Sequence, residues 1–333
     1  MVNLVEASVR ELLQINQQIY QNLPFWNQGQ GGNVSLKLPT GLMLIKPTGF
    51  RLDQLKRSDD LARVNHFDFL ERLKNLQLQN FEEIEKEARY NDLIVEAKKQ
   101  QNSVHRASME IGFHVALPRK FVLHFHHLNS VLFSEGLGSG FGDLKSESLE
   151  AFKKRWGSYF QWVDYQRPGW LLTETFLRST PTAPLIILRH HGVILQIDQV
   201  EEFEEFLKFD CELKELLNQE LSLNLSSLQK QIRHQITSCK AEFLCLYPDV
   251  AIVESKLKPY LKPEYEVGQN PKWRLLNSEA TPPDLLENWQ AMVYLQKANP
   301  QIGSLSHEQA EALKNLPTEL ARQKQMNQSK NGK

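Results

Sequence analysis

The sequence has few of the features that mark secreted or membrane proteins. Only three of its 333 residues are cysteines, and this odd, sparse set without metal-ligand spacing is typical of a reducing cytoplasm. No apolar run approaches the length of a bilayer span. The first residues carry charged side chains and no apolar segment of the kind that a signal peptide has. We therefore expect a cytoplasmic protein that does not bind a membrane.

An excess of charge of either sign is also missing. The chain has 39 Lys and Arg residues against 40 Asp and Glu residues, so its formal net charge is −1. This balance excludes the basic surface that nucleic acid or an anionic membrane attracts. Hydrophobic residues make up 41% and charged residues 24%, which are ordinary values for globular proteins and exclude a disordered or collagen-like chain.

Apolar periodicity and turn residues divide the chain into alternating helices and strands. The expected helices are 4–22, two or three within 52–101, and then 108–117, 200–238 and 283–296. The expected strands are 34–37, 41–46, 121–126, 185–190 and 250–253. This alternation predicts a layered α/β or α+β core. We interpret residues 51–105 as a helical insertion and residues 322–333 as a frayed tail.

Two histidines stand at alternate positions of a predicted strand. Side chains two residues apart share a face, so His124 and His126 can converge on one ion while Phe125 points the other way. His127 has the same parity as Phe125. Catalytic zinc sites typically have three protein ligands and an open position. The alternative is an ordinary pair of core or surface histidines.

A second histidine pair offers a third ligand. His190 and His191 end an apolar strand just before Gly192. Adjacent residues of a strand face opposite ways, so only one of the two can join the site. The periodicity does not decide which one.

A carboxylate precedes the first histidine pair. Glu110 and His114 are four residues apart, a spacing that places both on one face of a helix. Beside a metal, Glu110 could transfer protons; the alternative is an ordinary Glu–His surface pair. Ser108 suits the N-cap of this helix, where free amides favour a bound phosphate.

Two loops of small residues could bind an anion through backbone amides and short polar side chains. They are Gly31-Gly32-Asn33-Val34-Ser35 and Lys46-Pro47-Thr48-Gly49. Ordinary turns use the same residues. No P-loop and no GxGxxG motif is present, so a nucleotide-binding function has little support.

Together these motifs resemble the class II aldolase/adducin family. Its five motifs occur in the family's order over about residues 5–215: Gly32-Asn33-Val34-Ser35, Lys46-Pro47-Thr48-Gly49, Ser108-Met109-Glu110 with His114, His124-Phe125-His126, and His191-Gly192. A narrower resemblance is to the aldolase half of bifunctional rhamnulose-phosphate aldolase/dehydrogenase proteins. It rests on the 51–105 insertion, on Pro168-Gly169 after Tyr165, and on Pro248-Asp249.

The resemblance implies a three-layer αβα fold with a largely antiparallel central sheet. It implies His191 as the third metal ligand beside His124 and His126, and Glu110 as the acid/base residue. The implied cofactor is one divalent metal ion, with Zn2+ the first choice among zinc, manganese, cobalt and iron. The substrate's phosphate or other anionic end would contact Gly32, Asn33, Lys46, Thr48, Gly49 and Ser108. Met109 stands where fuculose-phosphate-type members have a second serine in this pocket.

The activity that the resemblance implies is a metal-dependent lyase reaction. A ketose, preferably phosphorylated, would undergo retro-aldol cleavage through a metal-stabilised enediolate. Epimerases, dehydratases and decarboxylases of sugars share the same site, and an adducin-like binding protein without catalysis is the other alternative. The resemblance also implies a homo-oligomer, expected to be a tetramer. We expect residues 1–238 to form the aldolase-like domain and residues 239–333 to be an extension packed on it.

Overall fold

The structure is a computed structural model, and it describes residues 2–136, 147–236, 240–241, 256–264, 272–299 and 307–315. The predicted strand 250–253 and the predicted tail 322–333 lie outside the described residues.

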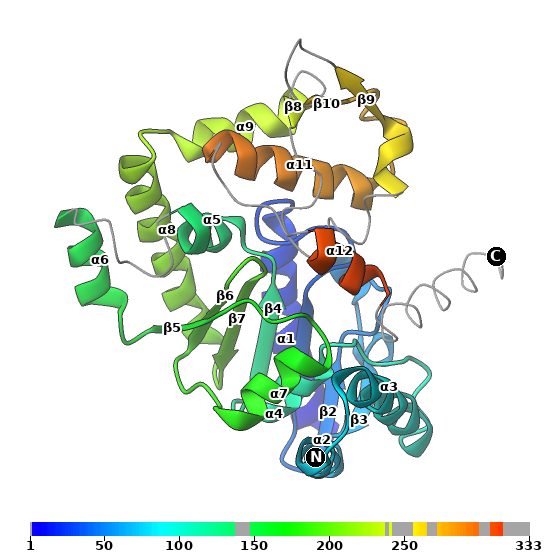
Figure 1. The fold of residues 1–333 in the computed structure, drawn as a ribbon. Coiled ribbons are helices and arrows are strands. Elements are labelled where there is room, and N and C mark those ends of the chain that lie inside the picture. The colour runs from blue at the N-terminus through cyan, green and yellow to red at the C-terminus, as the bar shows by residue number, and fades with distance from the viewer. Residues whose placement is uncertain are drawn as a thin grey trace.

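A seven-stranded sheet forms the centre of the molecule, with the strand order β3-β2-β1-β4-β7-β6-β5 (Figure 1). Only β5 and β6 pair in parallel; every other neighbouring pair in this sheet is antiparallel. The expected mixed α/β fold with a mostly antiparallel sheet is therefore confirmed. The strands are β1 Asn33–Lys37, β2 Leu42–Ile45, β3 Ala62–Asn65, β4 Phe121–Phe125, β5 Phe160–Val163, β6 Leu185–Leu188 and β7 Gly192–Ile197.

Helices cover both faces of the sheet because its strands alternate buried side chains between two sides. On β4, Phe121, Leu123 and Phe125 join one hydrophobic cluster, while Val122 joins another on the opposite face. The first face packs against α1 Val2–Gln21, α5 Leu128–Gly136, α6 Glu147–Trp156 and α8 Phe203–Glu220. The second face packs against α2 His66–Leu78, α3 Glu83–Gln100, α4 Ile111–Ala116 and α7 Trp170–Arg178.

Segment 51–105 is not purely helical, contrary to the prediction. It contains the edge strand β3, which pairs with β2, as well as α2, α3 and two short 3-10 helices, η1 Leu52–Gln54 and η2 Ser58–Asp60. Four residues are too few for a clear alternation, so β3 cannot be recognised from periodicity. Phe69, Leu73 and Leu76 are buried against the sheet, whereas Phe67 is exposed. The segment thus completes one layer of the fold.

Three predicted boundaries were wrong. The 200–238 region is divided into the 3-10 helix η3 Val200–Glu202, α8, and α9 Leu225–His234, with Ser222 at a φ of 52° between the last two. Helix α4 begins at Ile111 rather than Ser108, and β6 ends at Leu188 rather than His190. These ends depend on single backbone angles that apolar periodicity does not report.

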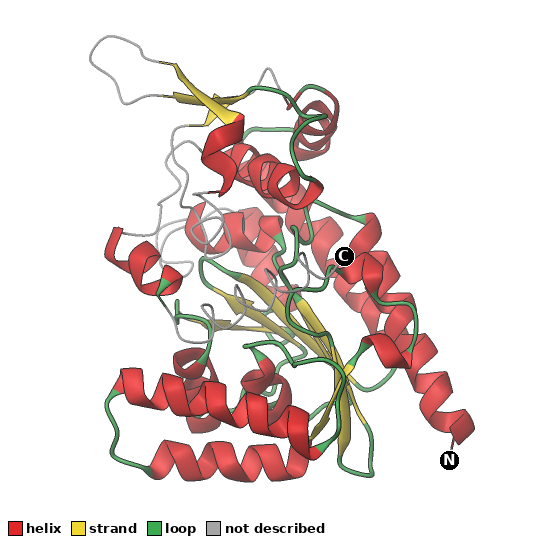
Figure 2. Cartoon of the chain, turned by 90° about the vertical axis from the view of Figure 1, so that its right-hand side faces the viewer, coloured by secondary structure: helices red, strands yellow, loops and turns green. Residues whose placement is uncertain are grey.

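Beyond α9 the described chain lies at the top of the molecule, past the upper ends of the sheet's strands (Figure 1 and Figure 2). Helix α11 Pro283–Ala298 packs against α5 and α9 and buries Trp289 and Tyr294 in the main hydrophobic cluster. The other elements here are β8 Lys240–Ala241, η5 Lys258–Tyr260, β9 Leu261–Glu264, β10 Lys272–Leu275 and α12 His307–Lys314. Among the described helices, none has the length and apolar character needed to cross a membrane.

Candidate metal centre

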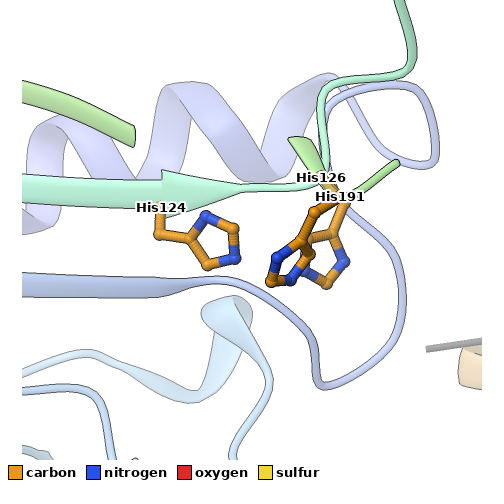
Figure 3. Close-up of side chains that lie close together, drawn as sticks. All are labelled: His124, His126 and His191. Atoms are coloured by element: carbon orange, nitrogen blue, oxygen red, sulfur yellow. The ribbon is translucent and has the colours of Figure 1, made fainter. Parts of the chain in front are cut away.

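Three histidines meet where the end of β4 lies beside the turn that precedes β7 (Figure 3). His124 lies in β4, His126 directly follows it, and His191 lies in the turn between β6 and β7. Each is buried, and one ring nitrogen from each lies within 4.8 Å of the other two. His190 adopts a φ of 54° and its ring lies 6.0 Å from that of Tyr165. Of the two candidates for the third position, the structure therefore brings His191 to the pair.

Gly192 allows this approach. Its φ of 148° lies in a region that other residues rarely adopt. A Cβ at this position would lie 2.5 Å from the carbonyl oxygen of Phe125 and 2.8 Å from the Cα of His126. Any larger residue would push the start of β7 away from the end of β4, and His191 away from His126.

His124 is oriented as a metal ligand would be. Its Nδ1 donates to the carbonyl oxygen of Val193 at 2.9 Å, so its Nε2 carries the lone pair. That Nε2 is buried and has no hydrogen-bond partner among the residues that the structure describes. Burial, together with the neighbouring His191 and His126, lowers the pKa of His124 well below 6.5. The ring is thus neutral, which is the form that binds a metal.

Glu110 lies beside the three histidines. Its Oε1 is 3.4 Å from Nε2 of His191 and 3.6 Å from Nε2 of His124. Its Oε2 accepts a hydrogen bond from Nδ2 of Asn33 at 2.6 Å. Asn33 is in turn placed by the sheet, where it stands directly opposite His124. One carboxylate oxygen is held by β1 while the other faces the histidine cluster.

The predicted placement of Glu110 and His114 on one face of a helix was wrong. Glu110 precedes the first residue of α4 instead of lying within the helix. His114 is fully buried, and its Nδ1 is hydrogen-bonded to the Oγ of Ser35 at 2.7 Å. The i, i+4 argument therefore does not apply, and Glu110 reaches the cluster from the turn before the helix.

The model of the class II aldolase and adducin N-terminal domain matches residues 10–203, which include all three histidines and Glu110. The chain belongs to this family. No curated protein matches it.

Solved structures of class II aldolases are similar to this chain at low sequence identity. The N-terminal class II aldolase domain of a protein from Thermoplasma acidophilum is 20% identical, covers 62% of this chain and 92% of its own, and has a TM-score of 0.48. The L-fuculose 1-phosphate aldolase of Thermus thermophilus is 15% identical over 64% of this chain and 94% of its own, with a TM-score of 0.41. That of Glaciozyma antarctica is 14% identical over 90% of this chain and 92% of its own, with a TM-score of 0.40.

In this class II aldolase-family chain, the two small-residue loops lie next to each other. Nζ of Lys46 donates to the carbonyl oxygen of Gln30 at 2.9 Å. The amide of Thr48 donates to the carbonyl oxygen of Arg106 at 3.0 Å, and a β-bridge joins Pro47 to Ala107. These contacts connect the glycine-rich loop (residues 27–33), the Lys46–Gly49 turn and the segment that leads to Ser108.

Gly32, Gly49 and Ser108 also belong to the set of residues predicted to bind the substrate's anionic end. Gly32 and Gly49 have φ values of 66° and 80°, and a Cβ on Gly32 would lie 2.8 Å from the carbonyl oxygen of His124. Ser108 is buried, and its Oγ accepts from the amide of Glu110 at 3.3 Å. It therefore caps the turn before α4 instead of the helix itself.

The contacts of His127, the residue after His126, could not be predicted from the sequence. His127 is fully buried, with Nδ1 2.8 Å from Oγ of Ser130 and Nε2 2.8 Å from Oδ1 of Asp210. Asp210 also accepts a hydrogen bond from Asn129 at 2.9 Å. The opposite parity of His127 was the only available signal, since Asp210 is about 80 residues away in the chain.

Proposed function

We propose that the protein is a metal-dependent lyase that cleaves a ketose, preferably a phosphorylated one, by a retro-aldol reaction. The observation that carries this proposal is the position of the Glu110 carboxylate, 3.4 Å from Nε2 of His191 at the edge of the three-histidine cluster. A cluster of ligands with a carboxylate beside it suits the making and breaking of bonds next to a carbonyl.

His124, His126 and His191 would hold one divalent ion, with Zn2+ as the first choice. Their donor set fits such an ion, because the three nitrogens are grouped within 4.8 Å and the Nε2 of His124 is buried with no hydrogen-bond partner in the described part of the chain. When bound, the ion would act as a Lewis acid that stabilises negative charge formed at the substrate's carbonyl oxygen.

Glu110 would transfer the proton. The hydrogen bond from Asn33 to its Oε2 restricts the carboxylate, so that Oε1 is presented to the cluster. As the C–C bond breaks, the hydroxyl group that becomes the aldehyde carbonyl must lose its proton. The Glu110 carboxylate would take up this proton, directly or through water, and deliver it to the carbon that retains the bonding electrons; in the synthetic direction the same transfers would run in reverse. A positioned carboxylate in this role contributes about 10²- to 10⁴-fold to the rate.

The substrate's anionic end would bind between the two small-residue loops. Backbone amides of Gly32 and Gly49 and the side chains of Lys46, Thr48 and Ser108 are the donors we assign to it. Lys46 is almost fully buried, so it is held in place for such a contact instead of sampling many conformations.

We further propose that the enzyme works in the cytoplasm as a homo-tetramer.

Metal analysis followed by a substrate screen tests this function. Purified protein, loaded with Zn2+, Mn2+, Co2+ or Fe2+ in turn, is incubated with phosphorylated and free ketoses, and aldehyde release is measured. We expect about one ion per chain and aldehyde release from at least one ketose phosphate. Release of an epimer, of water or of carbon dioxide without an aldehyde would assign a different reaction to the site.

A further inference from the structure

A carboxylate from α11 contacts the glycine-rich loop from outside the part of the chain that matches the family model. Oε2 of Glu287 accepts a hydrogen bond from the amide of Gly29 at 2.7 Å. The same side chain accepts two hydrogen bonds from the guanidinium of Arg51, Nη2 to Oε1 at 2.7 Å and Nη1 to Oε2 at 3.2 Å. The family model ends at residue 203, so Glu287 belongs to the addition that this chain carries beyond it.

The two segments that Glu287 joins are the two that we assign to the substrate's anionic end. Gly29 is three residues before Gly32 in the glycine-rich loop, and Arg51 is two residues after Gly49 in the other loop. Glu287 therefore links the two sides of the proposed anion pocket. The hydrogen bond from Lys46 to Gln30 is a second link between the same segments.

Helix α11 also packs closely against this loop. Gly29 has a φ of 53°, and a Cβ on it would lie 3.1 Å from Nδ2 of Asn288 and 3.2 Å from Cβ of Asp284. The residue before Gly29 in the chain is Gln28, and its side-chain Nε2 donates to the carbonyl oxygen of His126 at 3.1 Å. Helix α11 thus contacts this loop at Gly29, next to a residue that contacts the chain at the end of β4.

The Arg51–Glu287 ion pair is more buried than a typical surface ion pair, so it can fix the positions of the two loops more firmly. The Arg51 and Glu287 side chains are only 19% and 14% exposed, and the guanidinium binds the carboxylate through two nitrogens. Burial raises the pKa of Glu287, whereas the hydrogen bonds from Arg51 and Gly29 lower it. Arg51 also pairs with Asp53 at 3.2 Å, which restricts its guanidinium further. Such a fork fixes orientation as well as distance.

We propose that Glu287 and Arg51 are a positioning pair through which α11 holds the two anion-binding loops in their binding geometry. This inference rests on the proposed function for the identity of the pocket. Neither residue is assigned a contact with the substrate. The expected effect of losing the pair is therefore weaker binding of a phosphorylated substrate, with the chemical step and the metal preserved.

The first experiment measures the loops directly by hydrogen exchange in the metal-loaded full-length protein. Glu287→Gln keeps the shape of the side chain but removes its charge and one acceptor for Arg51. We expect faster amide exchange in peptides that cover residues 27–33 and 46–51. Glu174→Gln is the matched control, because Glu174 of α7 is 12% exposed and pairs with Lys86 of α3 at 3.2 Å and with Arg178 at 3.1 Å, neither of which belongs to the two loops. The control should leave exchange in the two loops unchanged.

The second experiment measures binding. Inorganic phosphate is titrated against the metal-loaded protein by calorimetry, and KM and kcat are measured on the ketose phosphate found in the screen. For Glu287→Gln we expect about a tenfold weaker affinity for phosphate and about a tenfold higher KM, with kcat within about twofold of wild type. Arg51→Gln should have the same effect, and the double variant should be no worse than either single one because the two act as a unit. Arg51→Gln also covers the case in which Glu287→Gln does not fold.

Two results would overturn the inference. One is unchanged exchange in residues 27–33 together with unchanged phosphate affinity in both single variants. The other is tighter phosphate binding in Glu287→Gln, which would mean that Glu287 merely neutralises Arg51. A failure of the proposed function is distinguishable, because a wild type that binds phosphate but releases no aldehyde from any ketose phosphate would leave the exchange and phosphate results in place.

Discussion

Replacing Glu110 by glutamine removes one negative charge from the edge of the histidine cluster while the side chain keeps its size. The amide oxygen of glutamine can still accept the hydrogen bond that Asn33 donates to Glu110 at 2.6 Å. The acceptor of this hydrogen bond changes from an ionised oxygen to a neutral one. The weaker bond lowers the free energy of unfolding by about 1 kcal/mol. We therefore expect Glu110→Gln to fold.

The catalytic loss should be much larger than the loss of stability. The Oε1 atom lies 3.4 Å and 3.6 Å from the Nε2 atoms of His191 and His124, and an amide in that position cannot take up or release the proton. We expect kcat to fall by about 10²- to 10⁴-fold, while KM changes little. The assay is steady-state aldehyde release on the ketose identified in the screen, together with thermal unfolding of each variant.

Glu87→Gln is the control for loss of a buried carboxylate. Glu87 is 1% exposed, and its Oε2 accepts from the amide of Trp170 at 2.8 Å at the start of α7. This variant should lose stability but keep kcat. Metal content after dialysis adds a second readout, since a large loss of metal from Glu110→Gln would make Glu110 a ligand of the resting enzyme. A near-normal kcat in folded Glu110→Gln would refute the assignment of proton transfer to this residue.

Further predictions concern the ligands, the anion pocket and the pH dependence of stability. Metal analysis of His126→Ala should show loss of the ion, whereas His190→Ala should retain it; equal, stoichiometric metal in both would contradict the ligand set. Thr48→Val should raise KM on a phosphorylated substrate by about tenfold without changing the unfolding midpoint, and unchanged kinetics would place the anion elsewhere. Burial lowers the pKa of His114 well below 6.5, so the unfolded chain takes up a proton that the folded chain does not bind. The metal-free protein should therefore lose up to about 1.4 kcal/mol of stability per pH unit below about pH 6.5 for this residue, and urea unfolding should show a shallower pH dependence in His114→Gln. An identical pH dependence in the two proteins would show that His114 does not contribute.

Some features of the site follow from the sequence because strand parity is a local property. The alternation in 121–126 places His124 on the face opposite Phe125 wherever the strand lies in the fold, and the structure has this arrangement. The close approach of Gly192 to the backbone of Phe125 and His126, in contrast, is seen only in the structure. The five ordered motifs indicated the family, which the match over residues 10–203 confirms.

Other features depend on where the chain turns. Strand parity allows only one of the two histidines before Gly192 to join the cluster and does not say which one. The structure decides it, because His190 adopts a φ of 54° in the turn that brings His191 to the cluster. Glu110 reaches the cluster because α4 begins one residue after it, a boundary that periodicity misplaced by three residues at Ser108. A single backbone angle decides each of these outcomes, and such an angle is determined by packing around the whole turn.

The remaining features join residues that are far apart in the chain. Gly29 and Glu287 are separated by 258 positions, and Asn33 and Glu110 by 77. The sequence by itself determined the residue types, the faces of the strands and the family. Only the tertiary structure decided how Glu110 reaches the histidines and which helix contacts the glycine-rich loop. The folding of distant segments against a common core sets these distances, and no local sequence pattern reports them.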